Sequence, residues 1–131
     1  MNGIERVKFY TEVATEAPFA YDPTAPSSDP AQKVFVAPAR WPQHGAVSLK
    51  LVSARYRPGL DLVLHDVSFS VEGGQKIGVV GRTGSGKSSL MLTLFRILEL
   101  AAGSIFIDGI DISTLGLTQL RKAIAMLPQD P

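Results

Sequence analysis

The sequence predicts an α/β fold with an antiparallel β-subdomain on one side, and the order of its segments supports this. Two segments of alternating apolar and polar residues come first, at residues 47–56 and 63–71. A continuous apolar run at residues 76–81 then leads through a glycine-rich turn into a helical segment, residues 87–98. Antiparallel strands followed by a strand–loop–helix unit are typical of this class of fold.

The 131 residues divide into three zones and fit one domain at most. Residues 1–13 suit a short, highly charged helix. Residues 14–45 are rich in proline, which removes amide donors and disfavours helix, so we expect an extended linker that serves as a spacer without chemistry. Residues 46–131 form the ordered zone.

The ordered zone begins with the alternating segments. In residues 47–56 the alternation slips phase at Leu51 and Val52, as a strand with a bulge would. The run at residues 76–81 is continuously apolar, which predicts a buried strand. Residues 87–98 are apolar on nearly every side, so we expect a helix that is buried all round.

Further strands follow Gly103. The pair Asp108-Gly109 between apolar residues predicts the turn of a β-hairpin. A short helix is expected from about Leu117. Residues 123–127 are expected to form a last buried strand that stops at Pro128.

Composition excludes several classes of protein. The formal net charge of +1 gives no reason to expect binding to nucleic acid or to an anionic membrane surface. Without cysteine there are no disulfides or thiolate metal sites. No apolar run approaches the about 20 residues that span a bilayer, and the acidic N-terminus lacks the apolar stretch of a signal peptide. The composition is that of a soluble, globular chain.

The glycine-rich turn carries the clearest chemical signal. It places Gly81, four further residues, Gly86, Lys87 and Ser88 in the spacing of a P-loop. Amides from about Gly84 onward would point at phosphates, and the helix N-terminus would add its positive end. The lysine is placed to reach the β- and γ-phosphates and the Ser88 hydroxyl to ligate Mg²⁺.

This pattern predicts binding of a purine nucleotide, Mg-ATP. The alternative, a glycine turn with an incidental lysine, is disfavoured by the apolar strand before the motif and the helix after it. The residues expected to contact the nucleotide here are Gly81, Arg82, Thr83, Gly84, Ser85, Gly86, Lys87, Ser88 and Ser89. For Arg82, as for Arg57, a plain surface charge is an equally good interpretation.

Residues 55–131 resemble the second nucleotide-binding domain of multidrug-resistance-associated ABC transporters, the C subfamily. The match is carried by RYRPGLDLVLHDVSFSVEGGQKIGVVGRTGSGKSSLMLTLFRILE and, without a gap, by GSIFIDGIDISTLGLTQLRKAIAMLPQDP. ERVKFYTE and Trp41-Pro42 also look like the junction that precedes this domain in the family. The resemblance implies the P-loop NTPase core of an ABC ATPase domain, truncated, with residues 1–13 as the end of a transmembrane-domain helix.

The resemblance also implies roles for single residues. Tyr56 occupies the position of the aromatic residue that stacks on adenine, although a tyrosine that merely ends a strand is the plain alternative. Gln129 resembles the Q-loop glutamine, which contacts Mg²⁺ or the attacking water, so Ser88 and Gln129 are the implied metal ligands. The histidines, His44 and His65, have no metal-ligand partner at useful spacing and are expected to be structural or exposed.

The implied activity is ATP binding and hydrolysis coupled to export of organic anions or drug conjugates. The implied partners are a second nucleotide-binding domain and the transmembrane domains of the parent chain, with this segment on the cytoplasmic side of a membrane. In the family, the LSGGQ signature, the Mg-binding aspartate, the catalytic glutamate and the switch histidine all lie beyond the position of Pro131. We therefore expect a fragment that does not hydrolyse ATP alone, binds it weakly and tends to aggregate.

Two other functions remain open from the sequence. One is a nucleotide-binding module that never hydrolyses ATP and has no role in transport. The other is a different P-loop protein such as a small kinase or GTPase, which would need a kinase lid or an NKxD-type motif and would leave Tyr56 and Gln129 unexplained.

Overall fold

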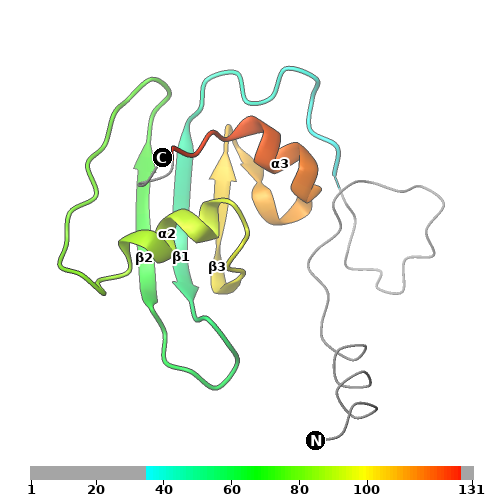
Figure 1. The fold of residues 1–131 in the computed structure, drawn as a ribbon. Coiled ribbons are helices and arrows are strands. Elements are labelled where there is room, and N and C mark those ends of the chain that lie inside the picture. Colours follow the sequence, from blue (N-terminus) through cyan, green and yellow to red (C-terminus); the bar gives the residue numbers. More distant parts are fainter. Residues whose placement is uncertain (1–34, 128–131) are drawn as a thin grey trace, which may run out of the picture.

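The computed structural model describes residues 35–127, and its centre is one antiparallel sheet with strand order β2-β1-β3-β4. Helix α2, the short 3₁₀ helix η1 and helix α3 pack on one face of this sheet (Figure 1). The elements are β1 (Val47–Ala54), β2 (Leu64–Val71), α2 (Lys87–Leu94), β3 (Leu100–Ile107), β4 (Ile110–Asp111), η1 (Ile112–Thr114) and α3 (Leu117–Ala123). The predicted antiparallel β-subdomain is therefore confirmed.

The predicted phase slip in β1 is a β-bulge. The pairing of β1 with β2 shifts register between Leu49 and Val52 of β1, and Leu51 between them has a left-handed φ of 47°. The extra residue lets Leu49 and Val52 both face the core, where they are 2% and 0% exposed. Gly103 of β3 lies against this bulge, since a Cβ there would stand 2.3 Å from the Leu51 carbonyl oxygen.

The predicted hairpin after Gly103 and the predicted short helix are also confirmed. Strands β3 and β4 pair with Ile107 opposite Ile110, and Asp108 and Gly109 form the turn with φ of 48° and 78°. Two positive φ values are what a tight type I′ turn needs. Helix α3 begins at Leu117, as predicted.

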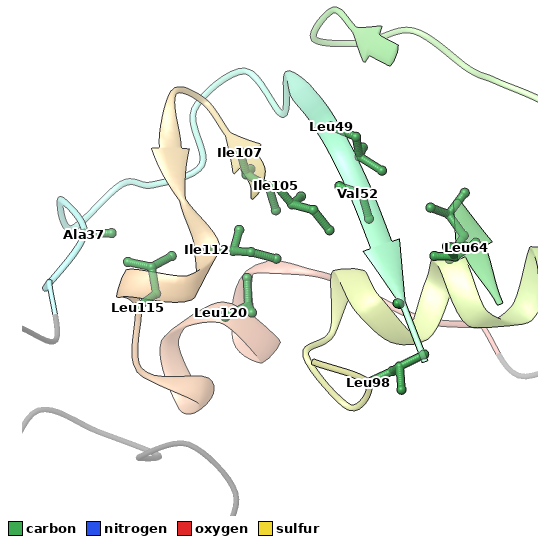
Figure 2. Close-up of a cluster of buried hydrophobic side chains, with 12 residues drawn as sticks. Ala37, Leu49, Val52, Leu64, Leu98, Ile105, Ile107, Ile112, Leu115 and Leu120 are labelled. Atoms are coloured by element: carbon green, nitrogen blue, oxygen red, sulfur yellow. The ribbon is translucent and has the colours of Figure 1, made fainter. Parts of the chain in front are cut away.

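The hydrophobic core lies between the sheet and the helices. Ile105 and Ile107 of β3 point toward Ile112, Leu115 and Leu120 (Figure 2). At the other end of the core, Leu64 of β2 and Leu98 complete the cluster (Figure 2). This core holds α2 and α3 to the same face of the sheet, and so fixes where the glycine-rich turn can lie.

Two predicted buried strands are wrong. Residues 76–81 belong to a long exposed loop beyond the β2 edge, and Val80 is 92% exposed (Figure 1). Residues 123–127 make no ladder either, and Leu127 is 93% exposed. A parallel strand needs hydrogen-bonded neighbours and cover on both faces, and within residues 35–127 nothing provides them.

Helix α2 is also shorter and less enclosed than predicted. It ends at Leu94, and Phe95 forms its C-terminal cap. Leu90 and Thr93 face the core, whereas Met91 is 41% exposed. The expectation of a helix buried on every side is therefore wrong for the described part of the chain. None of the helices within residues 35–127 has the length and apolar character needed to cross a membrane.

The end of the proline-rich segment is packed against the sheet and α3. The Trp41 indole donates to the Ile107 carbonyl at 3.0 Å. The Gln119 side chain of α3 bonds both backbone groups of Ala37, accepting from N–H at 3.1 Å and donating to the carbonyl at 3.0 Å. Residues 35–45 are thus an ordered strap. The predicted helix at residues 1–13 and the rest of the predicted linker lie outside the described residues.

Asp108 fastens the strap to the hairpin turn. One carboxylate oxygen accepts from the amides of Gln43 and His44 at 2.7 and 2.9 Å, and the other from Ala46 at 2.8 Å. These amides, that of His44 first, lower the pKa of Asp108 from its usual 3.8 to about 2. The carboxylate is therefore charged at neutral pH.

Replacing Asp108 with asparagine is expected to lower the free energy of unfolding by about 1–3 kcal/mol at neutral pH, because charge-assisted hydrogen bonds are lost. Asparagine tolerates the positive φ, so the turn itself survives. Because the folded-state pKa is depressed, this stabilisation is present above pH 3.8 and is lost as the pH falls toward about 2. Urea unfolding at several pH values measures it, with Asp61→Asn in an exposed loop as the control. A difference from wild type that does not shrink below pH 4 would contradict this origin.

Candidate nucleotide-binding site

The glycine-rich loop curls around the amino group of Lys87. Its Nζ donates to the carbonyl oxygens of Gly81 and Arg82 at 2.5 and 2.7 Å, with the Ser85 hydroxyl at 3.5 Å. The Ser85 amide closes a turn onto the Arg82 carbonyl at 3.1 Å. The loop therefore places a positive charge at the centre of a ring of backbone groups.

Helix α2 opens directly from this loop. Gly86 caps it with a φ of 89°, and no side chain accepts the free amides of its first turn. The first turn also carries no acidic residue. The N-terminal amides and the positive end of the helix dipole are thus available to an anion beside the Lys87 ammonium group.

A pocket of about 460 Å³ brings most of the predicted site residues together. Tyr56, from the loop after β1, lines it together with the glycine-rich loop and the start of α2. The full lining is Tyr56, Val63, Thr83, Gly84, Gly86, Lys87, Ser88 and Ser89. This pocket combines an aromatic side chain with the lysine and the backbone of the glycine-rich loop.

The remaining predicted residues do not line the pocket. Gly81, Arg82 and Ser85 contact the Lys87 side chain instead, because they accept hydrogen bonds from its Nζ. Arg57, like Arg82, is exposed at the surface, as are His44 and His65. Gln129 lies outside the described residues, so its placement stays a prediction.

Tyr56 is hydrogen-bonded to helix α2. Its hydroxyl and the Ser89 hydroxyl are 2.9 Å apart, so one donates to the other. Ser89 is 5% exposed whereas Tyr56 is 52% exposed, which leaves much of the ring open to solvent.

Ser88 is the predicted metal ligand that lies within the described residues. It lines the pocket beside Lys87. No cluster of three or more histidine, cysteine or acidic residues that could hold a metal ion occurs within residues 35–127. A serine hydroxyl is an oxygen donor of the kind that Mg²⁺ accepts beside nucleotide phosphates, so the pocket lining fits this ion.

Two arginines that sequence reasoning missed tie α2 to the segment after the hairpin. Arg96, 8% exposed, donates to the carbonyls of Ile112 and Leu115 at 3.2 and 2.9 Å. In return, Arg121 of α3 donates to the carbonyls of Phe95 and Arg96 at 3.0 and 3.1 Å. A single arginine inside an apolar helical run, as in FRILE, was the available signal, because a buried charge needs fixed partners.

Comparison with known proteins decides the family. A family profile described as ABC transporter matches residues 64–131, which is more than half of the chain. The chain belongs to the ABC transporter family. Its relatives include members of sub-family C, and its fold is that of an ABC ATPase domain.

The relatives of this ABC transporter chain are much longer than it is. It is 50% identical to the ABC-type transporter cicA of Emericella nidulans over 132 residues, which cover 100% of the chain but 9% of that protein. It is 49% identical to ATP-binding cassette sub-family C member 3 of Homo sapiens over 98% of the chain and 8% of that protein. The chain therefore spans less than a tenth of the length of these relatives.

A solved structure of a bacterial Atm1-family ABC exporter with ATP bound has the same fold. The TM-score is 0.70 at 31% sequence identity, over 97% of this chain and 20% of that one. The α/β ABC ATPase fold that the sequence predicted is thus confirmed for the ABC transporter chain.

Proposed function

We propose that this chain supplies the base-binding and phosphate-binding part of an ATP site in the second nucleotide-binding domain of a sub-family C exporter. The observation that carries the proposal is the pocket that joins Tyr56 to Lys87 and Ser88. Its aromatic wall fits adenine, and its lysine and amides fit a triphosphate.

Each residue has a distinct part in the proposed site. The Lys87 ammonium exchanges its carbonyl partners for β- and γ-phosphate oxygens, to which it is bound more strongly because they are charged. The free amides at the start of α2 hold the other phosphate oxygens. Ser88 would supply a protein ligand to Mg²⁺, and Gln129 a second by resemblance to the family, and the ion when bound would offset the charge of the phosphates.

The proposed role of the chain is binding, with hydrolysis dependent on groups supplied from elsewhere. None of the described residues that line the pocket is acidic, and the lining contains no histidine. Positioning of an attacking water needs such a group. In a complete exporter, we propose that the rest of the domain and a second nucleotide-binding domain supply it.

The proposal is tested by titrating the chain with a fluorescent ATP analogue in the presence of Mg²⁺ and displacing it with ATP. Saturable binding that ATP reverses supports an ATP site. Binding that ATP fails to displace would overturn it.

The isolated chain is expected to release no phosphate from Mg-ATP above the rate without protein, because the water-positioning group is absent from the pocket lining. A phosphate-release assay on the chain checks this, and the Lys87→Ala variant serves as the control for contaminating enzymes. Turnover that disappears in that variant would show instead that the chain is a self-sufficient ATPase.

The transported substrates and the partners belong to the proposed parent protein. We propose organic anions or drug conjugates as its cargo, transmembrane domains as its partners, and a cytoplasmic position for this segment. Sub-family C relatives and one named Multidrug resistance protein mrp-7, from Caenorhabditis elegans and 48% identical, support this. Exposed apolar side chains such as Val80 and Leu127 are proposed to meet the rest of the domain, which also explains why we expect the isolated chain to aggregate.

A further inference from the structure

The loop between β1 and β2 is fastened to the phosphate-binding helix at two points. The first is the hydrogen bond between the hydroxyls of Tyr56 and Ser89, at 2.9 Å. The second is a close backbone contact, since a Cβ at Gly86 would stand 2.8 Å from the carbonyl oxygen of Val63. The aromatic wall and the phosphate cradle are thus joined directly, outside the sheet.

The two contacts do different work. The contact at Val63 sets how near the end of the loop comes to α2, and the Val63 amide in turn bonds the Ala54 carbonyl at 2.8 Å. The Val63 contact lies at the other end of the loop, and the atoms nearest to Gly86 there do not include the Tyr56 ring. The hydrogen bond to Ser89 acts on the tip of that ring and so fixes its direction.

Ser89 and Tyr56 differ in burial, and the difference shows which of the two side chains is held by the other. Ser89 sits in the first turn of α2 and is 5% exposed, so it is immobilised by packing. Tyr56 is 52% exposed, so packing restrains its ring much less. A half-exposed aromatic ring with a hydrogen bond at its tip depends on that bond for its orientation.

We infer that Ser89 is a positioning residue that orients Tyr56 for the base of the nucleotide. The inference rests on the proposed ATP site and deepens it. Because Ser89 belongs to the phosphate-binding helix, base recognition is built onto the element that binds the phosphates. The hydroxyl of Ser89 therefore raises the affinity of the site for the nucleoside part of the ligand, whereas its amide serves the phosphates.

The test compares two ligands of the whole chain, Mg-ATP and Mg-tripolyphosphate, which lacks base and sugar. Tyr56→Phe and Ser89→Ala each remove one partner of the hydrogen bond and keep the ring and the Ser89 amide. Each is expected to weaken ATP binding about threefold to tenfold, the value of one hydrogen bond, and to lower the ratio of ATP to tripolyphosphate affinity by the same factor. Ser89→Thr keeps the hydroxyl and is expected to restore that ratio, and Ser113→Ala at an exposed position of η1 is the matched control.

A double variant separates positioning from general damage. If Tyr56→Phe and Ser89→Ala remove the same bond, the double variant binds ATP no more weakly than either single variant. Equal losses of ATP and tripolyphosphate affinity in the single variants would overturn the inference, as would unchanged affinities or additive effects in the double variant. Failure of the wild-type chain to bind either ligand would overturn the proposed ATP site itself, and the inference with it.

Discussion

Replacement of Lys87 by alanine is expected to weaken Mg-ATP binding by roughly 10- to 100-fold, the loss of one or two charge-assisted hydrogen bonds in a pocket. The amino group is the positive centre of the glycine-rich loop and already holds the carbonyls of Gly81 and Arg82. Without it, the phosphates would face those carbonyl oxygens directly, and like partial charges repel. Equilibrium titration with a labelled ATP measures the effect.

The matched control for this variant is Lys122→Ala. Lys122 is an exposed lysine of α3 that does not line the pocket, so its loss changes the net charge equally. An equal loss of affinity in both variants would mean that Lys87 acts only through overall charge, and would contradict its assigned place in the site.

Replacement of Gly86 by alanine is expected to weaken Mg-ATP binding at least about tenfold, because strain at this position adds to a steric clash. With φ at 89°, a side chain is disfavoured before any contact is made. The new Cβ would also stand 2.8 Å from the Val63 carbonyl, which must move away from α2. This displacement widens the pocket between Tyr56 and the start of α2.

A second glycine of the same loop provides the control. Gly84 has a φ of 82°, but a Cβ there would meet nothing within 4 Å. Gly84→Ala therefore carries the backbone strain without the clash, and is expected to weaken ATP binding less than Gly86→Ala. Circular dichroism establishes that both variants fold. Equal affinities in the two variants would show that the contact with Val63 is unimportant.

The antiparallel part of the fold could be predicted from sequence because its signals are local. Alternation predicted β1 and β2, and the slip at Leu51 predicted the bulge. Asp108-Gly109 predicted the hairpin, because few residues tolerate two successive positive φ values. Each of these features is determined by residues close together in the chain.

The runs at residues 76–81 and 123–127 show what local sequence patterns cannot predict. Both are apolar enough for buried strands, yet neither pairs with a strand within residues 35–127. Residues 76–81 and 125–127 are exposed in the structure. An apolar run reports only that a segment is suited to burial. Whether it becomes a strand depends on neighbours that are distant in sequence.

The candidate site likewise has a part that could be predicted from local sequence and a part that could not. The spacing of Gly81, Gly86 and Lys87 predicted the phosphate cradle, because a P-loop is continuous in sequence. Tyr56 was assigned only through a family resemblance, and the structure now places it in the same pocket. Its hydrogen bond to Ser89 joins residues 33 positions apart, and no periodicity or composition could have predicted it.

The strap illustrates a different limit. Within residues 35–45 there is no helix, as the prolines predicted, but the segment was interpreted as a spacer without chemistry. In the structure, Trp41 bonds the end of β3 and Asp108 accepts backbone amides on either side of Gly45. Hydrogen bonds between side chains and irregular backbone leave no periodic pattern in a sequence. The contacts of such a segment therefore cannot be predicted without the structure.

The most direct test of the central claim is to map Mg-ATP binding by NMR on the isotope-labelled chain. A bound nucleotide is predicted to shift the amides of Thr83, Gly84 and residues 86–89 together with the ring protons of Tyr56, since these line one pocket. The second pocket of about 400 Å³, beside Lys50 and Phe106, is the internal reference and is predicted to remain unchanged. Shifts confined to that second pocket, or shifts at the glycine-rich loop that leave Tyr56 unaffected, would contradict an ATP site built from both parts.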